Sequence, residues 1–350
     1  MAAAEPRPLP LEKFYPQLGP GFADLLTRLS GRKAAIVGHA RPDGDCIGAQ
    51  VALARVLASL GHDVVCVNPD AVPRRLRFLS QGTPFIRTDA MLARPRGAAA
   101  VFVDCADRER PGGRLKALFA SPEGNIDHHL SNDGYAAVNL VDSGSAATCE
   151  ILAGLILDRG LPLDAPAAQA LYTGILTDTG QFRFPSTSRR CFVLAGELVA
   201  RGADPAAAGY ELYERESPGK LRLLQGFLAS LRFECGGRIC VGLLPAGAYE
   251  ATGTTAEDSE GLVDYARSIE GVDIGVLIEE RRDGGVKASL RAKDAAFRVD
   301  LAASEFDGGG HACAAGLKLA AAPADFRERL LAALRLRLEE GDHARAAQGT

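Results

Sequence analysis

The segment Gly38-His39-Ala40-Arg41-Pro42-Asp43-Gly44-Asp45 stands at the end of an apolar run that begins at Ala34. A short apolar run that stops at Gly is typical of a buried strand. Beyond the segment, apolar residues from Ile47 to Leu57 recur at helical spacing, and Val64 to Val67 has the composition of a second strand. A strand, a helix and a strand in this order form a βαβ unit. The N-terminal half therefore predicts a parallel sheet with helices on both faces.

The pattern changes twice along the rest of the chain. Ala98 to Val103 and Asn125-Ile126 continue the series of strands, whereas the stretch from Ser145 to Ser230 is mainly helical. Strand-like segments then return in three places, which are Arg238 to Leu244, Ile274 to Glu280 and Val286 to Leu290. This order predicts a second, smaller α/β unit.

The length of 350 residues is about twice that of an ordinary domain, which also favours two domains. We expect the first α/β domain at residues 1–187 and a helical connector at residues 188–231. The second α/β domain is expected at residues 232–342, followed by a short tail at residues 343–350. Hydrophobic residues make up 47% of the chain and charged residues 24%, which is ordinary globular composition.

Charge and cysteine content exclude several classes of protein. A net charge of −4 argues against a protein that coats long DNA or RNA, because such binding neutralises many phosphates with Lys and Arg. The eight cysteines are scattered and form no CxxC pair, so we expect reduced, mostly buried thiols. No stretch approaches the roughly 18 apolar residues that a membrane span needs. We therefore expect a cytoplasmic protein that makes no membrane contact.

Acidic and imidazole side chains follow three of the predicted strands. They are His39, Asp43 and Asp45 after the first strand, Asp104 after Val103, and Asp127-His128-His129 after Ile126. Loops at the carboxyl ends of strands in an open α/β sheet meet in one crevice, so these residues are expected to be neighbours. Asp178 joins them at the predicted end of a helix, just before Gly180.

Two interpretations of this cluster compete at the level of single motifs. Asp-Gly-Asp after Pro is by itself most often a turn with a helix N-cap. Convergence of several carboxylates would, however, be strongly repulsive unless cations neutralised them. Carboxylates mixed with imidazoles favour Mn²⁺, with Mg²⁺ as the alternative. Two such ions about 3.5–4 Å apart could share a carboxylate and promote hydrolysis of a phosphate ester.

The sequence resembles the DHH phosphoesterase superfamily, and its DHH–DHHA1 branch in particular. The residues that carry the resemblance are five motifs in order, namely Gly38-His39-Ala-Arg-Pro-Asp43-Gly-Asp45-Cys-Ile-Gly48, Val103-Asp104, Asp127-His128-His129, Thr177-Asp178-Thr-Gly180 and Gly308-Gly309-Gly310-His311-Ala-Cys-Ala314-Ala315-Gly316. The resemblance covers nearly the whole chain, from about Ala34 to Leu319. The motif departs from its relatives at Ala49, where Ser is frequent.

The resemblance implies a role for each motif. One Mn²⁺ would be held by His39, Asp43 and Asp104, and the other by Asp45, Asp104, His128 and Asp178, so that Asp104 bridges the two. His129 would face the substrate phosphate, with a structural histidine as the alternative, and Asp127 would orient a histidine. The first domain would then be catalytic, and the second would bind substrate.

The glycine-rich motif allows two interpretations on spacing alone. Gly308, Gly309 and Gly310 could form a helix C-cap or tight turn, or they could let backbone N–H groups approach an anion. The resemblance favours substrate capture, with His311 and Arg291 contacting the phosphate or base.

The function that the resemblance implies is hydrolysis of short oligoribonucleotides or of 3′-phosphoadenosine 5′-phosphate. A phosphodiesterase acting on cyclic di-AMP or pApA shares the same motifs and is the alternative within the class. A non-catalytic nucleotide sensor is the alternative from another class, although such a protein would be expected to lack one of the ligands. The expected partner is a short RNA or small nucleotide and no long duplex, and a homodimer is one option for assembly.

Overall fold

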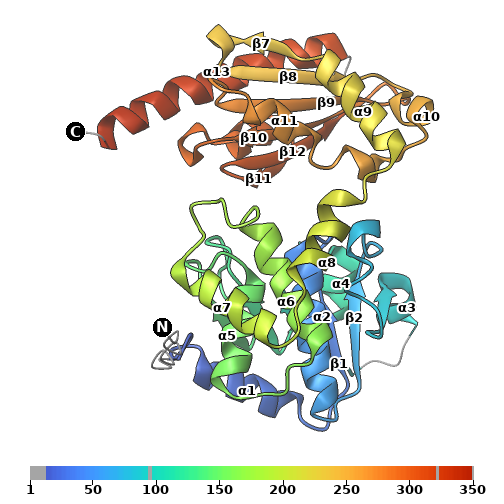
Figure 1. Ribbon diagram of the computed structural model, residues 1–350, viewed down its shortest axis with the longest axis vertical. Coiled ribbons are helices and arrows are strands. Elements are labelled where there is room, and N and C mark those ends of the chain that lie inside the picture. Colours follow the sequence, from blue (N-terminus) through green and yellow to red (C-terminus); the bar gives the residue numbers. More distant parts are fainter. Residues whose placement is uncertain (1–12, 94–96, 321–322, 349–350) are drawn as a thin grey trace, which may run out of the picture. The chain divides into compact units, whose positions relative to one another are not determined.

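The computed structural model describes residues 13–93, 97–320 and 323–348. It divides into two compact units, the first ending at Arg215 and the second beginning at Glu216. Both units combine helices with a six-stranded sheet (Figure 1). The prediction of two α/β units is thereby confirmed.

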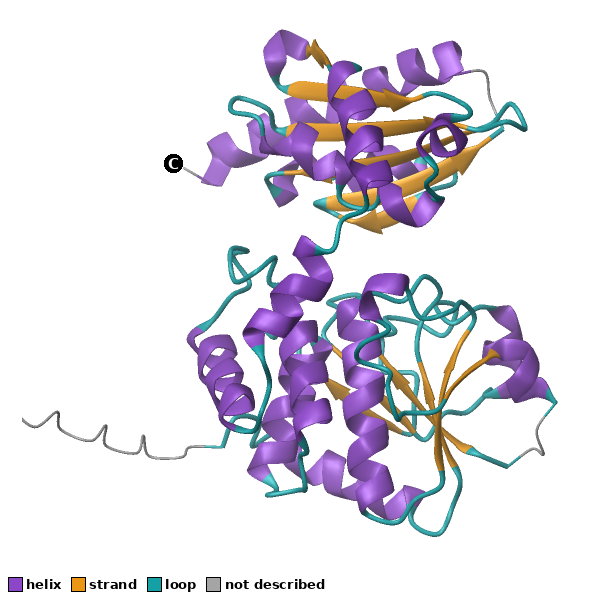
Figure 2. Cartoon of the chain, turned by 45° about the vertical axis from the view of Figure 1, so that its right-hand side comes forward, coloured by secondary structure: helices purple, strands orange, loops and turns teal. Residues whose placement is uncertain are grey.

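The sheet of the first unit is wholly parallel, and Figure 2 shows its strands fanning out beneath the helices. Its strand order is β3-β2-β1-β4-β5-β6. The strands are β1 (Ala34–Val37), β2 (Val64–Asn68), β3 (Phe85–Arg87), β4 (Ala99–Val103), β5 (Gly124–Asp127) and β6 (Val138–Val141). The chain reverses its direction of travel across the sheet between β3 and β4, so β1 and β4 are neighbours at the switch point where ligands bind in such folds.

Helices cover both faces of this sheet, as the sequence predicts. One face carries the large core shared by α1 (Gly19–Leu29), α2 (Gly44–Ser59), α5 (Thr148–Asp158), α6 (Ala165–Asp178) and α7 (Arg189–Ala200). The other face packs against α3 (Thr88–Leu92) and α4 (Gly113–Leu118). The first unit ends with α8 (Pro205–Gly209) and a π-helical turn at Tyr210–Glu214.

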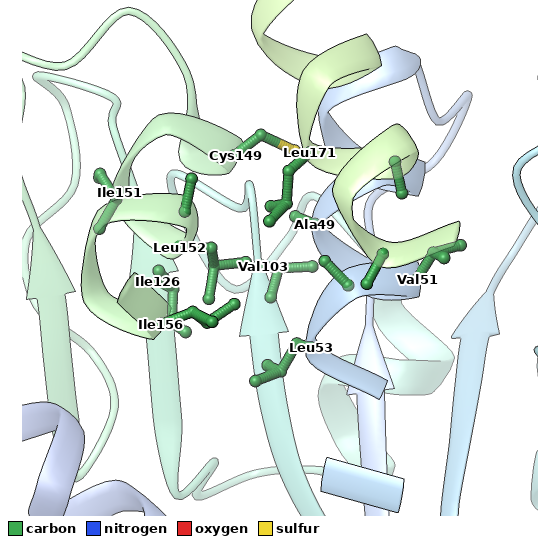
Figure 3. Packing of buried hydrophobic residues seen from close by; sticks show 14 of the residues in the cluster. Ala49, Val51, Leu53, Val103, Ile126, Cys149, Ile151, Leu152, Ile156 and Leu171 are labelled. Atoms are coloured by element: carbon green, nitrogen blue, oxygen red, sulfur yellow. The ribbon is translucent and has the colours of Figure 1, made fainter. Parts of the chain in front are cut away.

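The large core fixes α2 and α5 against the centre of the sheet. Figure 3 shows Leu53 from α2 and Leu152 from α5 closing on Val103 of β4 and Ile126 of β5. All four side chains are fully buried. Since the polar residues of the sequence motifs directly follow β4 and β5 or open α2, this packing determines where they lie.

The second unit has a mixed sheet with the order β11-β12-β10-β9-β8-β7. Its strands are β7 (Arg232–Glu234), β8 (Ile239–Leu244), β9 (Ile274–Glu280), β10 (Val286–Ala292), β11 (Gly309–His311) and β12 (Ala314–Leu319). One face is covered by α12 (Val299–Ser304) and α13 (Pro323–Gln348), the other by α9 (Pro218–Ala229) and α11 (Leu262–Ser268). A short helix, α10 (Ala248–Thr252), follows β8.

The structure divides the chain at a different place from the domain boundaries expected from the sequence. The segment expected to be a connector, residues 188–231, is shared between the units, because α7 packs on α6 whereas α9 packs on β8. The expected tail, residues 343–350, is helical as far as Gln348, where the described part of α13 ends.

None of the helices in the described part of the chain combines the length and apolarity that crossing a bilayer requires.

Candidate metal centre

The motif residues of the first unit meet at the carboxyl ends of its central strands. His39 follows β1, Asp104 follows β4 and His128 follows β5. Asp43 is the N-cap residue of α2, and its carboxylate accepts a hydrogen bond from the Cys46 N–H. Asp45 lies in the first turn of the same helix, and Asp178 is the last residue of α6.

His39 faces two of the carboxylates. Its Nε2 lies 3.1 Å from Oδ2 of Asp104 and 3.8 Å from Oδ1 of Asp43. His39 and Asp104 are buried, whereas half of the Asp43 side chain is exposed. One imidazole and two carboxylates therefore lie close together, and their role as ligands of a first metal ion stays a prediction.

His128 faces the remaining carboxylates and shares Asp104 with His39. Its Nε2 lies 3.5 Å from Oδ2 of Asp178, 3.6 Å from Oδ1 of Asp104 and 4.0 Å from Oδ2 of Asp45. The two oxygens of Asp104 thus point at different histidines. This is the arrangement that a bridging carboxylate requires.

The tautomers of the two histidines suit metal binding. His39 Nδ1 lies 2.8 Å from the Ala40 carbonyl, and His128 Nδ1 lies 3.4 Å from the Ser145 carbonyl. A carbonyl only accepts, so each Nδ1 carries the proton and donates. Each Nε2 is then the nitrogen that could offer its lone pair to a cation placed between the histidine and the carboxylates.

Residues at the N-terminus of α5 form hydrogen bonds with the carboxylates that lie around His128. Asp45 is fully buried, and its carboxylate accepts hydrogen bonds from the Thr148 and Cys149 N–H groups at 2.6 and 2.8 Å. The Thr148 hydroxyl donates to Asp104 over 3.3 Å. These contacts could not be predicted from the sequence, because any residue at a helix start offers such N–H groups.

His129 and Asp127 form a pair beside the cluster. His129 Nδ1 lies 2.7 Å from Oδ1 of Asp127 and 3.7 Å from Oδ1 of Asp104. The second Asp127 oxygen accepts a hydrogen bond from the Asn132 amide at 2.7 Å. Burial alone would raise the pKa of Asp127, but the hydrogen bonds from His129 and Asn132 lower it overall. Asp127 is thus an anion that holds the His129 ring.

The charges in the cluster are poorly balanced without a cation. Burial and then the negative charge of Asp104 raise the pKa of Asp45 to about 7, and burial and Asp45 raise that of Asp178 well above its usual range. Burial disfavours protonation of His39, yet Cys46 and Asp104 beside it raise its pKa. The site therefore attracts positive charge, and imidazole and carboxylate donors fit divalent cations of the Mn²⁺ or Mg²⁺ type.

Cys46 lies closer to this centre than the sequence analysis anticipated. Its sulfur, a His39 nitrogen and an Asp104 oxygen lie within 4.8 Å of one another. Burial raises the pKa of the Cys46 thiol. In the sequence, the only indication that Cys46 lies near the centre is that it directly follows Asp45.

Backbone strain is concentrated at the site. Asp104 has a φ of 56°, in the left-handed region that residues other than Gly, Asn and Asp rarely adopt. Gly180, Gln181 and Phe182, just after Asp178, form a run of three left-handed residues with φ of 55°, 63° and 60°. Strain of this kind is typical of functional sites.

The motif residues of the second unit share one face of its sheet. Arg291 on β10 and His311 on β11 both pair in register with Ala314 of β12, so the three form one row across neighbouring strands. Directly opposed residues of antiparallel strands point to the same face. The row therefore brings together two residues that are 20 positions apart in the sequence.

The glycines form an edge strand rather than the cap or turn considered from the sequence. Gly309 and Gly310 belong to β11, and the left-handed residue that follows α12 is Asp307. A Cβ atom on Gly310 would lie 2.3 Å from the Ala314 carbonyl, and one on Gly308 would lie 2.5 Å from Cβ of Leu317. Close strand packing thus requires glycine at 308 and 310, whereas Gly309 has open space.

Two protein-family models match parts of this chain. Residues 33–175 match the model of the DHH family N-terminal domain, and residues 239–340 match that of the DHHA1 domain. All the metal-centre residues except Asp178 fall within the first range, and Arg291 and the glycine-rich motif within the second.

Relatives and solved structures cover most of the chain. The bifunctional oligoribonuclease and PAP phosphatase NrnA of Thermus thermophilus is 35% identical over 86% of this chain and 88% of its own length. The protein of the same name from Bacillus subtilis is 28% identical over 80% of this chain and 87% of its own length. The structure of an exopolyphosphatase-related protein from Bacteroides fragilis shares the fold with a TM-score of 0.84 at 24% identity, covering 91% of this chain and 97% of that one.

Proposed function

Because this chain belongs to the DHH family of metal-dependent phosphoesterases, we propose that it uses two Mn²⁺ ions to hydrolyse short oligoribonucleotides and 3′-phosphoadenosine 5′-phosphate. The observation that carries the proposal is the convergence of two imidazoles on four carboxylates, with Asp104 between the histidines. Relatives named for both activities cover most of the chain and support the choice of substrates.

The residues of the first unit have separate tasks in this proposal. His39 and Asp43 hold one cation, Asp104 holds both, and a second group of ligands completes the other position, namely Asp45, His128 and Asp178. When bound, the two cations would activate a water molecule and neutralise charge on the phosphoryl group. Mn²⁺ is favoured over Mg²⁺ because the donor set mixes imidazole nitrogens with carboxylates.

His129 and Asp127 act on the substrate side of the centre. The hydrogen bond from His129 Nδ1 to Asp127 fixes the orientation of the ring, which supports a role for His129 in contacting the substrate phosphate. Burial works against a charge on His129, yet the hydrogen bond to Asp127 and the nearby Asp104 raise its pKa. A cationic His129 suits an anionic substrate.

The second unit recognises the nucleotide. Arg291 and His311 in one register row offer a guanidinium and an imidazole to a phosphate or base. The glycines beside them leave the backbone of the edge strand accessible.

All eight cysteines are free, six of them buried, which supports a reducing compartment such as the cytoplasm.

A substrate panel tests the proposed function. The full chain is assayed with Mn²⁺ on 3′-phosphoadenosine 5′-phosphate, pApA, cyclic di-AMP and RNA of graded length. Hydrolysis of short RNA and 3′-phosphoadenosine 5′-phosphate, abolished by chelation, supports it. Preference for cyclic di-AMP or pApA would assign the alternative phosphodiesterase, and nucleotide binding without turnover of any substrate would indicate a sensor.

A further inference from the structure

The segment that joins β6 to α5, Asp142–Glu150, contacts the metal centre without contributing a ligand to it. We call it the β6–α5 junction. Its backbone and one hydroxyl contact three of the ligand side chains, which are Asp45, Asp104 and His128. Neither His39 nor Asp43 takes a hydrogen bond from it among those of the described residues. The junction therefore supports one side of the centre, the side proposed for the second cation.

An ion pair between a partly exposed arginine and a buried glutamate holds the back of this junction. Arg190, in the first turn of α7, donates from Nε to Glu150 over 2.7 Å, and the Glu150 side chain is fully buried. The other Glu150 oxygen accepts a hydrogen bond from the Ala146 N–H at 2.6 Å. The pair thus joins α7 to the junction just before its N–H groups reach Asp45.

Arg190 also forms hydrogen bonds with residues at the start of the junction. One terminal nitrogen lies 3.0 Å from both the Asp142 carboxylate and the Ser145 hydroxyl. The guanidinium lies over the Tyr15 ring, 4.3 Å from its centroid, and the Tyr15 hydroxyl hydrogen-bonds Ser145 at 2.8 Å. Ser145 is the residue whose carbonyl faces His128, so the fork of Arg190 constrains both ends of the junction.

We infer that Arg190, through its pair with Glu150, is a positioning residue that sets the geometry of the second metal position and leaves the first largely unaffected. The inference rests on the proposed function only in assuming that the centre holds two cations. Without Arg190 the buried Glu150 charge has lost its principal counter-charge, so it must take up a proton or draw in water. Either response shifts the junction, so that Asp45, His128 and the Asp104 oxygen that faces His128 lose their fixed orientation, whereas the Asp104 oxygen that faces His39 has no contact with the junction among the described hydrogen bonds.

The test measures metal binding rather than activity. Mn²⁺ is titrated into metal-free protein, with calorimetry giving affinities and the electron paramagnetic resonance of free Mn²⁺ giving stoichiometry. We expect two sites in the unmodified chain. In Arg190→Met one site should weaken by about 10–100-fold, the range usual for changes just outside a ligand shell. The other site should change little.

A matched control separates positioning from general destabilisation. Arg55 makes a comparable fork to Asp164, which caps the N-terminus of α6 at the opposite end from Asp178. Arg55→Met should lower the melting temperature of the metal-free protein while leaving both Mn²⁺ affinities unchanged. Arg190→Lys keeps the charge but not the fork, so it should give an intermediate loss at the same single site, and it serves if Arg190→Met does not fold.

The outcomes distinguish this inference from the proposed function. Folded Arg190 variants with both affinities unchanged, or with both weakened equally, would overturn the positioning role. Selective loss of one site in a chain that hydrolyses none of the nucleotides would support positioning and overturn only the proposed function. A wild-type chain that binds fewer than two Mn²⁺ would overturn both.

Discussion

At the scale of single residues, Asp104 has the most demanding position in the centre. Its two oxygens face different histidines, and its backbone adopts a left-handed conformation. Asn tolerates that conformation nearly as well as Asp, so Asp104→Asn removes charge with little cost to the backbone. The chain thus permits a clean test of whether this carboxylate serves both metal positions.

We predict that Asp104→Asn lowers kcat by more than the 10²–10³-fold, roughly, that follows loss of one charge-stabilising contact. Asp43→Asn is the matched comparison, because Asn is an equally good N-cap and Asp43 is proposed to serve one metal position only. It should lose less activity. Steady-state kinetics in saturating Mn²⁺ and melting curves decide the matter, and near-normal turnover of folded Asp104→Asn would disprove the two-metal assignment.

The pH dependence of metal binding follows from Asp45. Burial, and next the charge of Asp104, raise its pKa in the metal-free chain to about 7, so the folded state binds a proton there that the unfolded state releases near pH 4. Between about pH 4 and 7 this group therefore makes the metal-free protein less stable as pH rises. A cation needs the ionised carboxylate and must displace the proton.

We accordingly expect Mn²⁺ affinity to fall by about tenfold per pH unit below pH 7 for this one proton, and to level off above it. Calorimetry at pH 6 in two buffers with different ionisation enthalpies measures the protons released per cation. Equal affinity at pH 6 and pH 8 would contradict the expectation.

The sequence indicated which side chains meet, but not what orients them. Asp and His residues after successive strands are visible as a pattern, because strand ends in a parallel sheet converge. The N–H groups of Thr148 and Cys149, and the pairing of Glu150 with Arg190, carry no such signal. They depend on how α5 and α7 are seated, which periodicity alone does not determine.

At the scale of elements, the close crossing of α2 and α6 carries Asp45 and Asp178 to the centre. A Cβ atom on Gly48 of α2 would lie 2.4 Å from the Ala170 carbonyl of α6. A Cβ atom on Gly174 of α6 would lie 2.3 Å from the Cys149 sulfur and 3.0 Å from an Asp45 oxygen. Glycine at these positions allows the helices to approach.

We predict that Gly48→Ala destabilises the first unit by about 1–3 kcal/mol, the usual cost of overpacking, despite the better helix propensity of Ala. Gly196→Ala in α7 is the control, since nothing lies within 4 Å of its added methyl group. It should stabilise by roughly 0.5–1 kcal/mol. Urea unfolding of both variants measures the difference, and stabilisation by Gly48→Ala would show that the crossing can relax.

Arg291 and His311 lie in one row across β10, β12 and β11, and we predict that they bind the substrate without taking part in the hydrolytic step. Arg291→Ala and His311→Ala should leave Mn²⁺ affinity unchanged and lower kcat/KM for nucleotides far more than for bis(p-nitrophenyl) phosphate. Arg281→Ala, in the hairpin between β9 and β10, is the control and should alter neither substrate. Equal losses on both substrates, or loss of Mn²⁺, would argue against a recognition role.

Most strands of the fold could be predicted from the sequence, because apolar runs bounded by turn residues indicate them. The strands β3 and β6 escaped, since they have three and four residues and β6 includes a polar Asn139. Strands β7 and β12 were not predicted either. Edge strand β11 was not predicted because glycine has low strand propensity, and its pairing with β12 comes from tertiary packing. The boundary at Arg215 escaped because nothing in the helical region marks which sheet a helix covers.

At the scale of the whole molecule, the net charge limits the length of nucleic acid that the chain can bind. A chain with a net charge of −4 offers no long basic track, and its sequence has no run of aromatic residues interleaved with Lys or Arg. Only a few phosphates can be neutralised at once. Additional nucleotides should therefore contribute little to binding.

We predict that kcat/KM peaks for RNAs of about two to five nucleotides, at or below the lower limit of the roughly 4–16 that one strand-binding module occupies. The plot of log kcat/KM against log salt should have a slope shallower than about −3, as expected for up to four phosphate contacts on a single strand. Assays over graded lengths at several salt concentrations measure both. Efficiency that still rises beyond ten or so nucleotides, with a steep slope, would indicate a processive nuclease.

The order of the ligands along the chain has a consequence for the kinetics of folding. They run from His39 to Asp178 and come from three strand ends and two helices, so contacts between His39, Asp43 or Asp45 and the later ligands close long loops. We expect such non-local contacts to form late in folding, because the entropy of closing a long loop is lost before the contact is gained. A cation that needs the finished set cannot help to nucleate the unit. Mn²⁺ should therefore slow unfolding while leaving the refolding rate nearly unchanged, and during synthesis the centre can assemble only after α6 has left the ribosome.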